Sequence, residues 1–307
     1  MVSVGIVVLA WNEAEETAAC LGSLSRIDFP EATVLVVDNG SQEDIGAALK
    51  KSYPYVQVVR LPRNLGFAGG MNAGLKWFLD KGFPYVLLLN NDTRVDPHFL
   101  TALVQAMDAH PHAAAANPKI FFADHPHDIW FAGGVIRLPA FRTIHRGYRE
   151  TDHGQYDQMT DMDYLTGCCM LLRSSVLKST GLLDPVYFNQ CEDVDLSLRL
   201  RRVGHDLLFV PAARIFHRVS FTIGGELAPM NLYYGFRNNL RIVFRFRRRP
   251  VALLYHAVLG PVSMTLKMAL RRNGPAVRAI LMGVRDFFLN RGGEGAGTSL
   301  YQRRVDE

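Results

Sequence analysis

Asn90-Asn91-Asp92 is a set of residues whose types and spacing could do chemistry. It directly follows the apolar run 85–89, which predicts a buried parallel strand. Polar groups at the carboxyl end of such a strand lie where open α/β sheets bind ligands. Asp92 could hold a divalent cation against a phosphate there. The alternative is an ordinary polar turn, because Asn and Asp are common turn formers.

Three further polar clusters follow predicted strands in the same half of the chain. They are Ala10-Trp11-Asn12-Glu13, Asp38-Asn39-Gly40-Ser41 and the segment from Asn64 to Asn72. Asp38 could accept hydrogen bonds from a ribose, or could only cap the following turn. The glycines at 66, 69 and 70 would let backbone amides approach a phosphate before a helix N-terminus. The segment is neither a dinucleotide fingerprint nor a P-loop.

Three acids within four residues, Glu192, Asp193 and Asp195, stand at the start of a predicted helix. Negative charge is stabilised at a helix N-terminus, so the cluster could be only an acidic cap. The alternative is that one carboxylate takes a proton from an attacking hydroxyl as a general base. His217 ends an apolar stretch and could ligate a metal, although a single histidine in that place is more often structural.

Strand and helix patterns alternate over the first 120 residues. This alternation predicts a parallel sheet covered by helices on both faces. The predicted strands are residues 4–9, 33–37, 56–59, 85–89 and 113–116, and the predicted helices are 13–24, 42–51, 68–80 and 97–110. Within the last helix, Asp96-Pro97 predicts the start, with a capping carboxylate and a proline at the first position.

The pattern changes between residues 119 and 163, where Gly133-Gly134 and the polar stretch 142–158 suggest a hairpin and a long loop. A loop of that length is usually functional or mobile. Regular structure returns in predicted strands 168–172 and 207–210 and predicted helices 174–179 and 193–203. The glycine-rich segment 292–297 is the part most typical of disorder.

Charge is distributed unevenly along the chain. The first 229 residues carry 20 basic and 25 acidic residues, whereas residues 230–307 carry 14 basic and 4 acidic ones. A basic patch on an otherwise acidic protein predicts a polyanionic partner, either a membrane surface or a nucleic acid. The sequence contains no nucleic-acid-reading module, so we expect an anionic membrane and no nucleic acid.

The apolar stretch 251–270 follows the basic run 245–249. It contains His256, Gly260-Pro261 and Lys267, which make it a poor transmembrane span. We expect an amphipathic element that lies in the membrane interface. The alternative is that these helices pack on the main domain and the arginines form a solvated face. The four cysteines lack CxxC spacing and no signal peptide is evident, which together predict a cytoplasmic location with reduced thiols.

Taken in order, these clusters resemble the family 2 glycosyltransferases with the GT-A fold, especially the rhamnosyltransferase-like branch. The resemblance runs from about Val4 to His217 and is weaker over residues 233–239. The motifs that carry it are VVLAWNE, VVDNGS, NLGFAGGMN, LLNND, LTGCCMLLR, GLLD and EDVDLSLR, followed by His217. The family implies an α/β fold with a mostly parallel, Rossmann-like sheet. We expect a catalytic domain over residues 1–229, with nucleotide-binding (1–120) and acceptor-binding (121–229) halves, and a basic helical segment over 230–307.

The resemblance also implies a role for individual residues. The nucleotide-sugar would be bound by Ala10, Glu13, Asp38, Asn64, Gly66, Asn72 and Asn91. Asp92 matches the last acid of the DxD metal motif, and His217 matches an additional metal ligand. Asp193 matches the catalytic base, with Gly167 and Glu192 near the acceptor. The first acid of DxD is Asn90 here, so a Mg²⁺ or Mn²⁺ ion would depend on Asp92 with help from His217.

These expectations describe a peripheral enzyme at the inner face of the plasma membrane. It would move a sugar, with rhamnose as the candidate, from a UDP- or TDP-type donor to a lipid-linked or polysaccharide acceptor. The loop 142–158 is expected to contact that acceptor. A catalytically silent sugar-nucleotide or glycan binding protein is the alternative, but it would be expected to lack the base. A nucleotidyltransferase is disfavoured, since residues 10–19 contain no Gly, Lys or Arg for a triphosphate.

Overall fold

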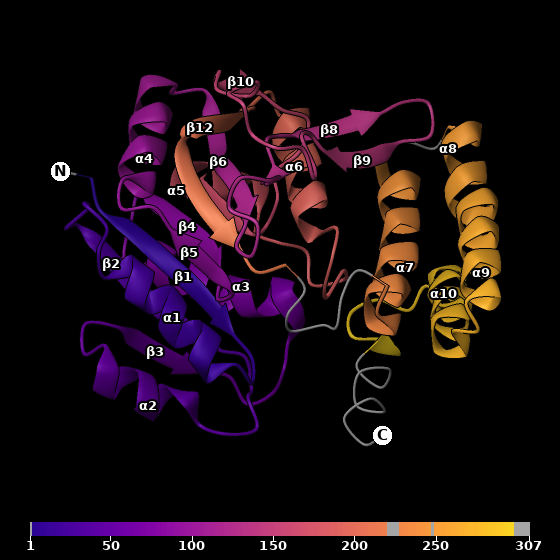
Figure 1. Cartoon of the computed structure of the whole chain (residues 1–307), viewed down its shortest axis with the longest axis horizontal. Helices are drawn as coiled ribbons and strands as arrows, with labels where there is room; N and C mark the ends of the chain where they lie inside the picture. Colours follow the sequence, from indigo (N-terminus) through magenta and orange to yellow (C-terminus); the bar gives the residue numbers. More distant parts are fainter. Residues whose placement is uncertain (1, 220–226, 247–248, 298–307) are drawn as a thin grey trace.

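The computed structural model describes residues 2–219, 227–246 and 249–297. A mixed sheet in the order β10-β12-β6-β11-β4-β1-β2-β3 forms its centre (Figure 1). The strands on this path are β1 (Val4–Ala10), β2 (Ala32–Asp38), β3 (Gln57–Arg60), β4 (Tyr85–Asn90), β6 (Ala113–Phe122), β10 (Thr160–Asp161), β11 (Cys169–Arg173) and β12 (Asp206–His217). Two short strands pair from the side, β5 (Thr93–Val95) with β12 and β7 (Ile129–Phe131) with β6.

The sheet contains two parallel parts joined by one antiparallel strand. β3, β2, β1 and β4 run parallel to their neighbours, and β6 runs parallel to β12. Between these parts, β11 pairs antiparallel with both β4 and β6. β1 and β4 are buried along almost their whole length rather than on alternate residues. Continuous burial is typical of strands that are covered on both faces, which confirms the predicted α/β class.

Six helices connect these strands. They are α1 (Ala14–Leu24), α2 (Ile45–Ser52), α3 (Gly66–Asp80), α4 (Phe99–Ala109), α5 (Ser174–Thr180) and α6 (Glu192–Arg202). The predicted start of α4 is wrong by two residues. The Asp96 carboxylate accepts a hydrogen bond from His98 N at 3.0 Å, and the Asp96 carbonyl accepts one from Phe99 N. Asp96-Pro97 therefore forms a turn before the helix instead of its first turn.

Two strands are longer than predicted. β6 reaches Phe122 rather than residue 116, and β12 reaches His217 rather than residue 210. The register of β6 against β12 shifts between Val210 and Arg214, after which the two strands pair up to His217. Because of this irregularity, the sequence pattern does not predict the second part of β12. That part of the strand brings His217 to the edge of the sheet.

The C-terminal part is helical. It consists of α7 (Pro229–Phe246), α8 (Pro250–Leu254), a π-helical turn η1 (Tyr255–Leu259), α9 (Gly260–Leu270) and α10 (Gly274–Phe288). These helices stand at one edge of the molecule, next to the hairpin of β8 (Gly134–Arg137) and β9 (Arg142–His145) (Figure 1). The predicted hairpin at Gly134 is thus present. Within the basic run 245–249, residues 247 and 248 lie outside the described residues.

Helix α7 is joined to the first part of the chain through Arg237, which is fully buried. Its guanidinium donates to the carbonyls of Tyr187 and Gly293, both at 2.8 Å. The glycine-rich segment also packs here, because Tyr234 Oη donates to the carbonyl of Glu294 at 2.8 Å. The expectation of disorder over 292–297 is therefore wrong. The predicted division at residue 229 remains a prediction.

Helices α8, η1 and α9 expose apolar side chains along one side, at a spacing of three or four residues. These residues, which we call the outer stripe, are Val251, Leu254, Val258, Val262, Leu266 and Leu270. The stretch Pro250–Leu270 has the length and apolar composition of a membrane-crossing helix, despite the interruptions that argued against a span.

Candidate active site

A cavity of about 900 Å³ opens at the carboxyl ends of β1 and β4. Its walls come from the loops after these strands, from β9, from the segment 188–190 and from the start of α7. Among the residues predicted as a site, the lining includes Asn64, Gly66, Asn91, Asp92 and His217. Segments far apart in the sequence therefore meet where open α/β sheets bind ligands.

Asp92 and His217 face each other in this cavity. Strand pairing brings them together, because His217 on β12 stands opposite Thr93 on β5. His217 Nε2 lies 3.2 Å from Asp92 Oδ1, and both residues are buried. Apart from this contact, Asp92 Oδ1 and His217 Nδ1 lack hydrogen-bond partners among the described residues. Buried polar atoms without partners are uncommon and indicate a ligand or ion.

This pair fits a divalent cation that takes most of its ligands from elsewhere. Within residues 2–219, 227–246 and 249–297, no group of three or more His, Cys, Asp or Glu is arranged to hold a metal. A single carboxylate with a nearby imidazole suits Mg²⁺ or Mn²⁺ completed by water and substrate phosphates. Asn90, the residue in place of the first DxD acid, also lines the cavity.

An amide network shapes the loop of Asn64 and Gly66. Asn39 Nδ2 donates to Asn64 Oδ1 at 3.0 Å and to the Gly66 carbonyl at 3.1 Å. Asn64 Oδ1 also accepts from Gly66 N at 2.7 Å. Gly66 has a φ of +73°, and a Cβ on it would lie 2.4 Å from the carbonyl oxygen of Phe188. A side chain at this position would clash with Phe188, so only glycine fits. Gly66 is also the first residue of α3, and it lines the cavity.

Four predicted nucleotide-sugar residues lie outside the cavity lining: Ala10, Glu13, Asp38 and Asn72. Asp38 is fully buried, and its Oδ1 accepts from Ser41 N at 2.9 Å. The Asn72 amide donates to the Leu183 carbonyl at 2.7 Å and accepts from Leu183 N at 3.1 Å. Asn72 therefore joins α3 to the GLLD segment. A direct contact of these four residues with a nucleotide remains a prediction.

Asp193 stands at the N-terminus of α6 with its carboxylate fixed by two backbone amides. Gly167 N donates to Oδ2 at 2.9 Å and Val194 N to Oδ1 at 2.7 Å. A Cβ on Gly167 would lie 3.0 Å from the ring of Phe67, which lines the cavity, and 3.7 Å from Asp193 Cβ. Gly167 thus lies beside Phe67 of the cavity lining, and Asp193 is next to Gly167 and partly exposed.

Burial raises the pKa of both Asp193 and its neighbour Glu192. It raises the pKa of the Asp193 carboxyl above its ordinary value, although the two amide hydrogen bonds oppose this shift. The pKa of Glu192 rises well above its usual range, because of burial and then the charge of Asp193. Glu192 Oε2 lacks a hydrogen-bond partner among the described residues. A carboxylate with a raised pKa is a stronger base, so Asp193 is suited to accept a proton.

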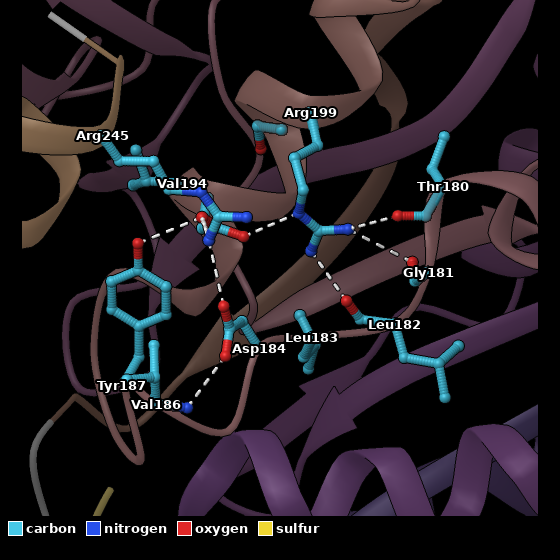
Figure 2. Close-up of polar contacts among 12 residues, drawn as sticks. Thr180, Gly181, Leu182, Leu183, Asp184, Val186, Tyr187, Val194, Arg199 and Arg245 are labelled. Atoms are coloured by element: carbon cyan, nitrogen blue, oxygen red, sulfur yellow. Dashed lines mark hydrogen bonds and ion pairs between the residues drawn. The ribbon is translucent and has the colours of Figure 1, made fainter. Parts of the chain in front are cut away.

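The third acid of the cluster, Asp195, has a structural role. Its Oδ2 accepts from Arg199 Nε at 2.7 Å, and its Oδ1 accepts from Tyr187 Oη at 3.0 Å and from Arg245 at 2.9 Å. Figure 2 shows Arg199, Tyr187 and Arg245, which come from α6, the segment 180–187 and α7. Arg245 also binds Asp184 at 3.0 Å. Through these contacts Asp195 joins α6, the segment 180–187 and α7. The acidic motif therefore combines a candidate base with an ion-pair centre.

An aromatic part of the cavity lining was not predicted residue by residue. It contains Trp130, His145, Tyr148 and Tyr164. The ring of Trp130 lies 4.6 Å from that of His217 and 4.5 Å from that of His145, measured between centroids. Burial lowers the pKa of His145 to about 4, so its imidazole is neutral at pH 7. The polar composition of residues 142–158 predicted that this region is functional. It did not predict which side chains face the cavity.

Relatives of known function share the sequence pattern. The family model "Glycosyl transferase family 2" matches residues 5–181. The N-acetylglucosaminyl-diphospho-decaprenol L-rhamnosyltransferase of Mycobacterium tuberculosis is 26% identical over 254 residues, which cover 73% of this chain and 78% of that protein. The dTDP-rhamnosyl transferase RfbF of Shigella flexneri is 25% identical over 254 residues, covering 78% of this chain and 80% of that protein.

Solved structures share the fold at low sequence identity. The mannosyltransferase PcManGT from Pyrobaculum calidifontis, in complex with GDP-Man and Mn²⁺, has a TM-score of 0.59 at 15% identity, covering 92% of this chain and 79% of that chain. GalNAc-T7 with UDP, GalNAc and Mn²⁺ has a TM-score of 0.60 at 15% identity, covering 86% of this chain and 58% of that chain. The predicted GT-A fold and rhamnosyltransferase-like resemblance are confirmed, and the chain belongs to glycosyl transferase family 2.

Proposed function

We propose that this enzyme is an inverting glycosyltransferase of cell-envelope glycan synthesis. It moves a sugar, with rhamnose as the first candidate, from a UDP- or TDP-type donor to a hydroxyl of a lipid-linked or polysaccharide acceptor. The observation that carries the proposal is the arrangement around one cavity. Asp92 and His217 stand in its lining, and the carboxylate of Asp193 is fixed by Gly167 N next to Phe67 of the same lining. The printed names of the two rhamnosyltransferase relatives support the choice of sugar.

The proposed reaction is one displacement at the anomeric carbon. The acceptor hydroxyl loses its proton to Asp193, its oxygen forms a bond to the anomeric carbon, and the bond to the nucleoside diphosphate breaks. Hydrogen bonds from Gly167 N and Val194 N fix the orientation of the Asp193 carboxylate. Because the carboxylate is already oriented, less conformational entropy is lost when it aligns with the acceptor hydroxyl, which lowers the activation free energy.

The donor diphosphate is placed by this chain's own groups. Gly66 is the first residue of α3 and lines the cavity, so the positive end of the helix dipole there favours an anion, while the amides of Gly66 and Ala68 donate to Asn64 Oδ1 and the Phe188 carbonyl. Asp92 and His217 would hold Mg²⁺ or Mn²⁺, which when bound neutralises charge on the departing diphosphate. Trp130 packs against His217 and restricts its ring orientation.

The proposed location is the cytoplasmic face of the plasma membrane. The outer stripe exposes apolar side chains on α8, η1 and α9, and exposed arginines flank it at Arg249, Arg271 and Arg272. Apolar side chains beside arginines suit an anionic bilayer interface. A membrane is therefore the proposed partner of this edge of the molecule.

The test is release of nucleoside diphosphate from a panel of UDP-, TDP- and GDP-sugars. Each donor is incubated with polyprenyl-diphosphate-linked N-acetylglucosamine, with Mg²⁺, Mn²⁺ or EDTA. We expect release from one donor to depend on the acceptor and to stop in EDTA. Tight binding of a donor without release from any of them would instead support the silent binding protein. Release that continues in EDTA would contradict the metal assignment only.

A further inference from the structure

A second cavity, of about 300 Å³, adjoins the first and lies between β9, α7 and the helix formed by η1 and α9. The two cavities share Arg142, Thr143 and Asn231 in their linings. The rest of the second lining is Leu232, Gly235, Phe236, Asn239, Tyr255, His256, Gly260, Ser263 and Met264. A path therefore leads from the site of sugar transfer to the helix that carries the outer stripe.

Arg142 is the only arginine or lysine among the described residues that line either cavity. No aspartate or glutamate belongs to the described lining of the second cavity. Arg142 is exposed and forms no ion pair with another described residue. Its guanidinium lies 5.8 Å from the ring centroid of Tyr255, a cation–π contact. A charged group is thus available at the point where the two cavities meet.

The π-helical turn connects this cavity to the membrane-facing helix. Tyr255 and His256 of η1 point toward β9, and His256 Nε2 lies 3.0 Å from the carbonyl oxygen of Ala140 and 3.2 Å from that of Phe141. These contacts hold the strand start just before Arg142. The outer-stripe residues on this helix are different from the residues that line the second cavity. Irregular π turns often occur where a helix contributes to a site.

We propose that the second cavity binds the lipid side of the acceptor, a polyprenyl diphosphate. Arg142 binds the diphosphate, while the acceptor sugar extends into the larger cavity toward Asp193. Leu232, Phe236 and Met264 contact the first isoprene units. The assignment rests on the proposed function and names its acceptor class. Arg142 is a binding and specificity residue, since it takes no part in breaking or forming bonds.

The chemistry of the site favours this ligand. A guanidinium binds phosphate oxygens with two parallel hydrogen bonds, and it does so whether the phosphates belong to a lipid or to a nucleotide. The apolar residues beside Arg142 distinguish the two sources, because they suit an isoprenoid rather than a ribose. Asp92, the one carboxylate of the described first lining, would repel a free diphosphate in the absence of metal.

The first experiment measures binding of farnesyl diphosphate in EDTA, so that a metal ion at Asp92 cannot recruit it. We expect wild type to bind it at least tenfold more tightly than farnesol, and Arg142→Ala to lose about tenfold or more of that affinity. Arg142→Lys should retain part of it. The control is Arg137→Ala, because Arg137 is exposed opposite Arg142 on the same hairpin but lines neither cavity.

The second experiment compares two acceptors that carry the same sugar, one on a polyprenyl diphosphate and one on an uncharged alkyl chain. Arg142→Ala should raise KM for the diphosphate acceptor about tenfold or more, with KM for the alkyl glycoside and for the donor unchanged. An equal loss with both acceptors, a raised donor KM, or equal losses in Arg137→Ala would overturn the assignment. Arg142-dependent farnesyl diphosphate binding without any sugar transfer would leave this site standing and refute the proposed function.

Discussion

At the scale of single residues, the site separates chemical roles among neighbouring acids. Asp193 is fixed by backbone amides, Glu192 is buried beside it, and Asp195 is fully committed to an ion-pair network. The three carboxylates occupy four positions of sequence, yet their surroundings differ completely. Local environment rather than residue type decides which acid can exchange protons.

Asp193→Asn should lower kcat by about 10² to 10⁴, because a general base contributes about that factor. The donor KM should stay within about twofold, since Asp193 lies outside the lining that holds Asp92. Steady-state kinetics with the donor identified by the panel would measure both constants. Asp124→Asn, an exposed acid outside both cavities, is the matched control. An Asp193→Asn enzyme with full activity would refute the base assignment.

Glu192→Gln should make the protein more stable at pH 8 than wild type. Because the folded-state pKa of Glu192 is raised, folding favours its protonated form. Its contribution to stability is fully present below the unfolded pKa and is lost as pH rises through the folded pKa. The Tm difference between variant and wild type should therefore grow from pH 5 to pH 8. A difference that does not change with pH would contradict the raised pKa.

At the scale of elements, pairing and packing place the functional groups. β5 and β12 bring Asp92 to His217, and the positive φ of Gly66 lets α3 begin at the cavity. On α6, Asp195 accepts from Tyr187 Oη and from Arg245, and so fixes this helix against the segment 180–187 and α7. The position of the candidate base therefore depends on contacts with the C-terminal helices.

Asp195→Asn should destabilise the protein by about 3 kcal/mol, because it leaves Arg199 without its charge partner in a largely buried site. Thermal unfolding would show this as a lower Tm. Asp184→Asn removes a more exposed partner of Arg245 and should cost clearly less. An Asp195→Asn variant with the Tm of wild type would show that the buried network contributes little, and equal losses in the two variants would contradict the greater role of Asp195.

At the scale of the whole molecule, the C-terminal helices adjoin the candidate active-site cavity through the second cavity. The outer stripe lies on the same helix that lines the second cavity. A bilayer at this edge would bring a lipid-linked acceptor to the path that leads to Asp193. Membrane attachment and acceptor delivery would thus be two results of the same geometry.

A triple variant, Val258→Ser, Val262→Ser and Leu266→Ser, should reduce binding to anionic liposomes about tenfold or more, because each exposed apolar side chain contributes about 1 kcal/mol. Wild-type binding should also weaken as salt rises, since the flanking arginines act through screened charge. Liposome sedimentation measures both effects. Val203→Ser, which removes an exposed valine directly after α6, should leave binding unchanged. Equal binding by the triple variant would refute the membrane proposal.

The sequence by itself determined the family, the α/β class and the order of the motifs, because apolar runs and turn residues act over a few neighbouring positions. It also singled out Asp92, Asp193 and His217 as chemical groups. It misplaced the start of α4 and the ends of β6 and β12, where side-chain capping and a register shift override local pattern.

Only the tertiary structure decided which residues share a cavity. It brought His217 to Asp92 across 125 positions, left Asp38 and Asn72 outside the lining, and placed Arg142 where two cavities meet. Such relations depend on strand pairing and on the packing of distant helices. No short stretch of sequence determines these contacts between distant residues, because the free energy that stabilises each contact comes from many residues at once.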